Sequence, residues 1–156
     1  MILVRAEVEK NIKSVMELKT VLQVGVKILL KNKEGKFLLL KRSREKYPEV
    51  EKRWDIVGGR INAGKTLLEN LKREVLEETG LKLVGTPKLI FAQDILKNVG
   101  QHVIRLTFLG KAKGKIKLDK KENDEYKWYS LEELNSLKDI NFYLKGFLKE
   151  RISELK

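Results

Sequence analysis

The chain has 156 residues and a formal net charge of +12, with 42% hydrophobic and 36% charged residues. This length suits one domain with its own core, no apolar run reaches the roughly 18 residues that span a bilayer, and the absence of cysteine excludes disulfides and thiolate metal sites. We therefore expect a single soluble domain over residues 1–156, in a reducing cytoplasm and without a membrane partner.

The excess of basic residues is spread thinly along the chain, through turns and strand ends. A solvated basic surface explains this distribution, and such a surface also attracts small molecules that carry phosphate. Nucleic-acid binding is the alternative, although no basic motif with interleaved aromatic residues supports it.

The first 20 residues leave a helix and an edge strand open as alternatives. The β-branched and apolar stretch VLQVGVKILL (21–30) and the stretch KFLLLKR (36–42) predict a β-hairpin in which Gly35 supplies the turn. The stretch RWDIVGG (53–59) predicts one short strand that ends in two glycines.

A helical period begins after Thr66 and ends at Gly80. Thr66 and Glu69 form a capping box, and Gly80 is a favourable residue just past the end of a helix. The helix is expected to pack on a sheet through one stripe, made of Leu68, Leu71, Val75 and Thr79.

The rest of the chain alternates strands and short helices. Residues 81–94 predict a broken strand and residues 102–114 a longer one, Ser130 and Glu133 form a second capping box before a short helix, and residues 141–155 predict a closing amphipathic helix. Strands around one central helix, with helices at the end, indicate an α/β sandwich with a mixed sheet.

Three glutamates, Glu74, Glu77 and Glu78, cluster on the central helix. At about 100° per residue they share an arc of roughly 100°, where like charges cost a few tenths of a kcal/mol per pair. A divalent cation would turn this cost into a gain, and ligands that are all oxygen favour Mg²⁺ or Mn²⁺. A solvated acidic face is the other interpretation. Glu69 points away from the arc and is explained by its cap.

The loop before this helix contains Gly58, Gly59 and Gly64. Glycines permit unusual backbone angles and let backbone atoms approach a metal or a phosphate. A strand, a glycine loop and a helix with clustered glutamates therefore indicate metal-assisted phosphoryl chemistry.

The stretch GRINAGKTLLENLKREVLEETGL (59–81) resembles the signature of the Nudix hydrolase family: Gly, five residues, Glu, seven residues, then Arg-Glu-apolar-x-Glu-Glu-x-Gly-apolar. The resemblance extends from Val21 to the end of the chain and implies a Nudix-fold α/β/α sandwich with a mixed central sheet. The matching positions are Gly59, Arg73, Glu74, Val75, Glu77, Glu78, Gly80 and Leu81.

Lys65 stands where the family has its first glutamate, and Asn62 where an acidic residue is often found. In the family that glutamate supports the metal site or pairs with the arginine that corresponds to Arg73, and a lysine can do neither. Glu69 lies on the wrong side of the helix to replace it. Lys65 therefore implies either reduced activity or a direct contact with a substrate phosphate.

The resemblance implies roles for the clustered residues. Glu77 and Glu78 are expected to bind Mg²⁺ (or Mn²⁺), Glu74 to be a ligand or the base that activates water, and the Gly59 carbonyl to complete the site. The metal would bridge the diphosphate oxygens and lower the pKa of the attacking water. Arg73 is expected to orient a glutamate through a charge-assisted bond.

Residues outside the signature complete the predicted site. Glu122 resembles a downstream acidic position of the family that adds a ligand or a base, with a charged loop as the alternative, and Arg42 and Arg60 are candidate phosphate contacts, with ordinary exposed arginines as the alternative. His102, the one histidine of the sequence, is assigned a structural role. Three aromatic residues could stack on a base or belong to the core: Trp54, Tyr126 and Trp128.

The predicted function is Mg²⁺-dependent hydrolysis of the pyrophosphate bond in a nucleoside diphosphate linked to another moiety. The substrates considered are a nucleotide sugar, ADP-ribose, a dinucleoside polyphosphate and a modified nucleoside triphosphate. A catalytically weak or inactive nucleotide sensor is the first alternative, because of Lys65. An enzyme that processes RNA 5′ ends is the second, because of the basic charge, and a homodimer is left open.

Overall fold

The computed structural model describes residues 6–7 and 20–156. The question of a helix or a strand in the first 20 residues falls on residues 1–5 and 8–19, which lie outside the described part. None of the helices in the described part has the length and hydropathy of a membrane-spanning helix.

Residues 20–156 form two sheets. The larger has the strand order β4-β1-β6-β5, and β1 runs parallel to β6 while the other neighbours are antiparallel. The mixed sheet predicted from the sequence is therefore confirmed. Its strands are β1 (Val21–Leu30), β4 (Val57–Arg60), β5 (Lys82–Ile95) and β6 (Gln101–Lys113).

The smaller sheet is antiparallel and has the order β3-β2-β7. Its strands are β2 (Phe37–Arg42), β3 (Trp54–Asp55) and β7 (Asn123–Tyr129). Strand β7 was not predicted, because five of its seven residues are exposed or half-buried and its charged stretch lacks the alternation of a half-buried strand.

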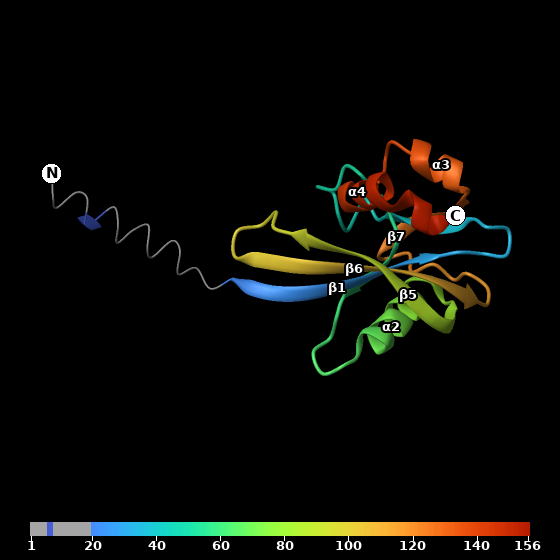
Figure 1. The fold of residues 1–156 in the computed structure, drawn as a ribbon, viewed down its shortest axis with the longest axis horizontal. Helices are drawn as coiled ribbons and strands as arrows, with labels where there is room; N and C mark the ends of the chain where they lie inside the picture. The colour runs from blue at the N-terminus through green and yellow to red at the C-terminus, as the bar shows by residue number, and fades with distance from the viewer. Residues whose placement is uncertain (1–5, 8–19) are drawn as a thin grey trace.

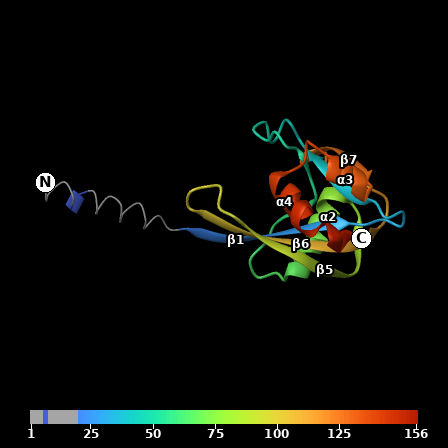
Figure 2. The same ribbon diagram turned by 45° about the horizontal axis from the view of Figure 1, so that its top comes forward.

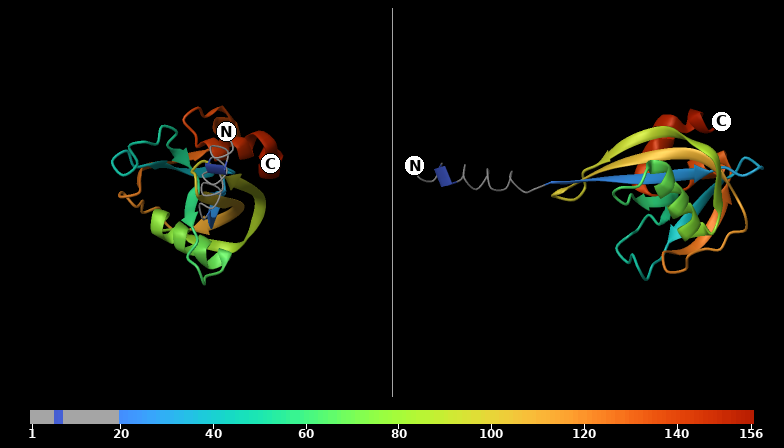
Figure 3. Two further views of the ribbon diagram at one scale, coloured as in Figure 1. Left: turned by 90° about the vertical axis from the view of Figure 1, so that its left-hand side faces the viewer. Right: turned by 90° about the horizontal axis from the view of Figure 1, so that it is seen from below.

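Helices cover both faces of the larger sheet. Helix α2 (Leu67–Thr79) lies on one side, and α3 (Leu131–Ser136) and α4 (Phe142–Arg151) lie on the other (Figures 1 and 3). The α/β/α sandwich expected from the sequence is confirmed. The chain closes with a 3₁₀ turn, η1 (Ile152–Leu155), so the last turn of the predicted closing helix is not α-helical. Strands β1, β5 and β6 extend together beyond the helices (Figure 2).

The hairpin predicted for the first two strands is wrong. β1 pairs with β6 along its whole length, from Val21 opposite Gln101 to Leu30 opposite Gly110, whereas β2 pairs with β3 and β7. Only one bridge, Lys31 to Phe37, joins the two segments at the turn. Gly35 does adopt the left-handed conformation predicted for that turn, at φ +79°. Apolar strands of this kind have many suitable partners, so the pattern predicts the strands but not their pairing.

The single strand predicted for residues 53–59 is also wrong, because the chain changes sheets at Ile56. Trp54 and Asp55 belong to the smaller sheet, and Val57 and the residues after it belong to the larger one. The Ile56 N–H donates to Asp55 Oδ1 at 2.8 Å instead of to a strand partner. This crossing places Asp55 and the glycine pair on different sheets but within a few residues of each other.

Helix α2 begins and ends as predicted. Thr66 and Glu69 form the reciprocal capping box, and Gly80 adopts φ +69° with its N–H donating to Leu76 at 2.9 Å. The stripe is partly wrong: Leu68 is 37% exposed, although the other three predicted members are buried. The buried residues of α2 include two polar ones that were not predicted to be buried, Asn70 and Glu74. Both lie toward the glycine loop, so the buried face of α2 is also part of the candidate site.

Candidate active site

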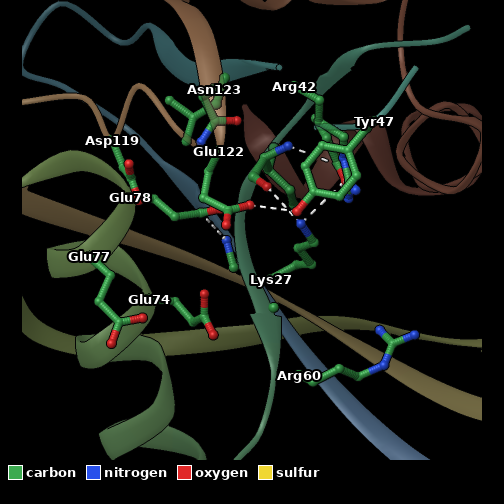
Figure 4. A pocket seen from close by; sticks show the side chains of 15 residues that line it. Lys27, Arg42, Tyr47, Arg60, Glu74, Glu77, Glu78, Asp119, Glu122 and Asn123 are labelled. Atoms are coloured by element: carbon green, nitrogen blue, oxygen red, sulfur yellow. Dashed lines mark hydrogen bonds and ion pairs between the residues drawn. The ribbon is translucent and has the colours of Figure 1, made fainter. Parts of the chain in front are cut away.

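A cavity of about 570 Å³ opens between helix α2, the ends of β2 and β4, and the loop before β7. Figure 4 shows the glutamates of α2 on one side and Arg42 and Arg60 on the other, with Lys27 between them. The cavity therefore has an acidic wall, formed by Glu74, Glu77 and Glu78, which faces a basic wall that includes Arg42 and Arg60. Its lining includes most of the residues predicted from the sequence: Arg42, Gly59, Arg60, Glu74, Glu77, Glu78 and Glu122.

The glycine pair lets the acidic wall approach the backbone of β4. Gly58 has φ +130°, and a Cβ there would lie 2.1 Å from the carbonyl oxygen of Val26, so only glycine fits. A Cβ on Gly59 would lie 2.9 Å from Glu74 Oε1. The Gly58 N–H donates to Glu78 Oε2 at 2.8 Å. The carboxylates of Glu74 and Glu78 thus rest against the backbone of β4, and a side chain at either glycine would obstruct this approach.

Arg73 holds the acidic wall together. Its Nη2 lies 2.6 Å from Glu74 Oε1, and its Nη1 lies 2.9 Å from Glu77 Oε2. The same Nη2 donates to the carbonyl oxygen of Arg60 at 3.0 Å, which ties the helix to the end of β4. The structure therefore places Arg73 against two glutamates and a strand end, in the arrangement expected of an orienting residue.

Asn70 fixes the loop that precedes the helix, and the sequence analysis did not identify it. Its Oδ1 accepts the Asn62 N–H at 2.8 Å, and its Nδ2 donates to the carbonyl oxygens of Lys65 and Thr66 at 3.3 and 2.8 Å. Asn70 is 1% exposed. Asn70 precedes Glu74 by about one helical turn and falls within the arc of the three glutamates, so its place on that face was the available signal.

Glu78 is the carboxylate of α2 whose surroundings disfavour the charged form. Burial raises its pKa to about 7, and the negative charges of Glu74 and Asp55 act in the same direction. The charge of Lys27 and the hydrogen bond from Gly58 oppose this shift without cancelling it. Glu78 is therefore protonated in about half of the molecules at pH 7, and a bound cation would displace that proton.

The basic wall is organised around a buried carboxylate, Asp55. Its Oδ1 lies 3.0 Å from Arg105 Nη2, and its Oδ2 lies 3.3 Å from Lys27 Nζ and 3.4 Å from Arg42 Nη2. Burial by itself would raise the pKa of Asp55, but Arg105, Lys27 and Arg42 outweigh it and hold that pKa well below its usual range. Asp55 is therefore ionised and neutralises only part of the positive charge around it.

Asp55, Lys27 and Arg105 were not predicted as site residues. Each is a charged residue between two apolar neighbours in a stretch predicted as a strand, and this is the signal that could have found them. Sequence spacing could not, because Lys27 and Asp55 lie on strands of different sheets and meet only through the change of sheet at Ile56.

Glu122 reaches the cavity from the loop before β7. It accepts hydrogen bonds from Lys46 Nζ and from the Tyr47 hydroxyl. Burial tends to raise its pKa, but the bonds from Lys46 and Tyr47 outweigh burial and lower it. Asp119, which was not predicted, lines the same side of the cavity, and its N–H donates to the Glu78 carbonyl oxygen at 3.0 Å.

Other predicted residues lie at the margin of the cavity or outside it. Lys65 is exposed and is not part of the lining. Arg60 is exposed at the rim, with its Nε 3.2 Å from Gln23 Oε1. His102 lies 2.7 Å from Asp94 Oδ1 on the projecting strands, in keeping with a structural role. Trp54 is buried against Tyr129, so it belongs to the core.

The donor set of the acidic wall fits a hard divalent cation. Three carboxylates supply oxygen alone, as Mg²⁺ requires, and the Gly59 backbone lines the same cavity. Burial, together with the negative charges of Glu74 and Asp55, raises the pKa of Glu78, and a bound cation would offset this effect. Among the described residues, no group of three or more acidic or histidine side chains is already arranged around a metal position. Glu74 and Glu77 instead bind Arg73, and Glu78 binds the Gly58 N–H.

Comparisons with known proteins identify relatives of this chain. The family model described as NUDIX domain matches residues 21–150. The chain is 29% identical over 136 residues to an RNA pyrophosphohydrolase of Bartonella bacilliformis, covering 72% of this chain and 80% of the relative. It is 30% identical over 102 residues to an 8-oxo-dGTP diphosphatase of Buchnera aphidicola, covering 65% and 73%. The crystal structure of the MutT protein from Methanosarcina mazei Go1 superposes with a TM-score of 0.73 at 31% identity, covering 87% of this chain and 96% of that one.

Proposed function

Because the chain belongs to the Nudix hydrolase family and is thus a hydrolase of phosphoric anhydrides, we propose that it cleaves the pyrophosphate bond of a nucleoside diphosphate linked to another moiety, with Mg²⁺ or Mn²⁺. One observation carries this proposal: the acidic wall of α2 faces a basic wall across a single cavity. The acidic wall suits a cation, and the basic wall suits the phosphates of a substrate.

The metal would be held by Glu74, Glu77 and Glu78, with the Gly59 carbonyl and Glu122 as further ligands. When bound, it neutralises phosphate charge and lowers the pKa of the attacking water. Glu74 is the alternative base for that water. Its carboxylate is buried and held by Arg73, so its position is fixed before substrate arrives.

The substrate side is formed by Arg42 and Arg60, which line the cavity opposite the glutamates. Both are proposed to contact phosphate oxygens. The substrate classes considered are a nucleotide sugar, ADP-ribose, a dinucleoside polyphosphate and a modified nucleoside triphosphate. The 8-oxo-dGTP diphosphatase of Buchnera aphidicola supports the last of these.

RNA 5′ ends are a second candidate substrate. The relative from Bartonella bacilliformis is an RNA pyrophosphohydrolase, and the net charge of +12 suits a polyanion. This candidate requires RNA binding that weakens with salt and release of pyrophosphate from a triphosphate end. Failure to bind RNA at moderate salt would remove it.

A nucleotide sensor without efficient turnover is the remaining alternative, and Lys65 motivates it. Against it, Arg73 keeps its contacts to Glu74 and Glu77 without help from residue 65. A cytoplasmic location and a homodimer stay predictions.

The test is a hydrolysis screen with Mg²⁺ across these nucleotide classes, comparing wild type with Glu77→Gln. We expect at least one substrate to be cleaved and Glu77→Gln to lose at least ~100-fold in rate, the scale of damage to a metal site. Glu69→Gln is the matched control, because it makes the same change on the same helix, and glutamine preserves a capping box. Equal rates for wild type and Glu77→Gln would contradict the role of Glu77, and nucleotide binding without any cleavage would support the sensor.

A further inference from the structure

The basic wall gathers three cationic side chains around one carboxylate. In the described part of the chain, Asp55 is the only carboxylate that an ion pair joins to Lys27, Arg42 and Arg105. Burial lowers the pKa of Lys27, and the charges of Asp55 and Glu78 oppose that shift without cancelling it. Lys27 and Arg105 are both buried, and an uncompensated buried charge is expensive.

Lys27 is not needed as a counter-ion for Asp55. Arg105 binds Asp55 Oδ1 at 3.0 Å, and Arg42 approaches Oδ2 at 3.4 Å, so both oxygens have a cationic partner without the lysine. A buried third cation on the same carboxylate therefore requires another explanation.

The ammonium of Lys27 is directed into the cavity with donor capacity to spare. It donates to the Ile56 carbonyl oxygen at 3.1 Å and lies 3.3 Å from Asp55 Oδ2, which occupies two of its three N–H groups. Lys27 lines the cavity between Arg42 and the glutamates (Figure 4). Arg42 is half-buried in the same lining, and its remaining guanidinium donors are available to an anion.

We propose that Lys27 and Arg42 form a phosphate subsite, held from behind by Asp55 and Arg105, which binds the terminal phosphate of a triphosphate-bearing substrate. This inference rests on the proposed function and narrows its substrate class. The cleaved pyrophosphate lies against the acidic wall and its cation, so a further phosphate reaches the opposite wall. A terminal phosphate carries a charge of about −2 near pH 7 and can accept hydrogen bonds from the two basic side chains that line the cavity here, Lys27 and Arg42. A nucleotide sugar would place an uncharged group there and leave their spare donors without an anionic partner.

The first experiment measures binding of inorganic triphosphate by calorimetry in EDTA, where neither a metal nor hydrolysis contributes. We expect Lys27→Met to weaken binding by about tenfold or more, the loss typical of one charge-assisted hydrogen bond. Lys31→Met is the matched control, because Lys31 follows the same strand and its Nζ donates to the Leu155 carbonyl oxygen outside the cavity. It is expected to bind like wild type.

Folding does not confound this test. Asp55 retains two arginine partners in Lys27→Met, and Lys27→Gln additionally keeps a donor for the Ile56 carbonyl oxygen. Thermal unfolding identifies the folded variants. Wild-type affinity in a folded Lys27 variant, or no binding of triphosphate to the wild-type chain, would overturn the subsite.

The second experiment compares kcat/KM for a nucleoside triphosphate and for ADP-ribose, with Mg²⁺. Lys27→Met should reduce kcat/KM for the triphosphate about tenfold more than for ADP-ribose, mainly through KM, because any effect of Lys27 on Glu78 is common to both substrates. Equal losses on both substrates would overturn the assignment to a terminal phosphate. If the wild-type chain binds triphosphate through Lys27 but cleaves nothing, the proposed function fails and the subsite stands. If it cleaves nucleotides while Lys27→Met binds triphosphate normally, the subsite alone fails.

Discussion

Arg73 Nη2 lies 2.6 Å from Glu74 Oε1, and this contact connects the buried and exposed parts of the acidic wall. Glu74 is buried, whereas Glu77, which the same guanidinium binds at 2.9 Å, is exposed. One planar cation thus orients two carboxylates in different environments. The guanidinium can orient both carboxylates because its donors have a fixed planar arrangement, which a lysine ammonium lacks.

Arg73→Lys should therefore retain the charge and lose the orientation. We expect kcat to fall by roughly 10- to 100-fold, the cost of removing support from metal ligands, while the melting temperature changes little because Arg73 is only partly buried. Lys72→Arg, at the exposed neighbouring position of α2, is the control. Unchanged kcat in a folded Arg73→Lys protein would show that Glu74 and Glu77 do not depend on this contact.

The raised pKa of Glu78, about 7, predicts that metal binding depends on pH. Below that pH a cation must displace a proton from Glu78, so the apparent affinity for Mg²⁺ should increase between pH 6 and pH 8. Calorimetry in buffers of different ionisation enthalpy would detect the released proton. Release of no proton at pH 6 would contradict the assignment of Glu78 as a ligand.

The same shift predicts how the metal-free protein responds to pH. A carboxyl whose pKa is raised on folding stays protonated while the unfolded chain releases its proton, so its contribution to stability is lost as pH rises from about 4.5 to about 7. In EDTA the melting temperature should fall over this interval, and Mg²⁺ should restore it at pH 7. Glu78→Gln should flatten this dependence, and a dependence that is the same in the variant would exclude Glu78 as its source.

The two adjacent glycines should respond differently to alanine. At Gly58 the new Cβ would meet the Val26 carbonyl oxygen at 2.1 Å in a backbone conformation unsuited to alanine, so Gly58→Ala should lose stability by at least the roughly 1–3 kcal/mol of such strain. At Gly59 the Cβ would meet only the Glu74 carboxylate, at 2.9 Å. Gly59→Ala should fold and lose most of its activity. Chemical denaturation and kcat would separate these outcomes, and equal stability losses would contradict them.

Lys65→Glu should have little effect on catalysis. Lys65 is exposed and outside the cavity lining, and Arg73 already has carboxylate partners on α2. We expect kcat/KM within about threefold of wild type. A gain of more than about tenfold would show that the lysine limits activity and would support the interpretation of this chain as a weak catalyst.

Local signals predicted the helices and the acidic wall from the sequence. The capping boxes at Thr66 and Ser130, and Gly80 after the helix, lie within a few residues of the ends that they define. The three glutamates share a helix, so the helical period alone places them together. Strands β5 and β6 were predicted for a similar reason, because each has its own pattern and turn residues.

The basic wall could not be predicted in this way, because non-local pairing creates it. Lys27, Asp55 and Arg105 come from three strands in two sheets. Their meeting depends on β1 pairing with β6 rather than with β2, and on the chain leaving one sheet at Ile56. The placement of the glutamates is predicted by the helical period, whereas the placement of these cations depends on how the strands pair.

The crossing at Ile56 has a consequence for how the site can change. Asp55 anchors the cations, Gly58 supports Glu78, and only Ile56 and Val57, both almost fully buried, separate them along the chain. Covalent connectivity, rather than attraction across the cavity, therefore sets the gap between the two walls. Inserting or deleting one residue here would disable the site without removing a charged group, so substitutions in the walls are a safer route to a new substrate preference than changes in the length of this connection.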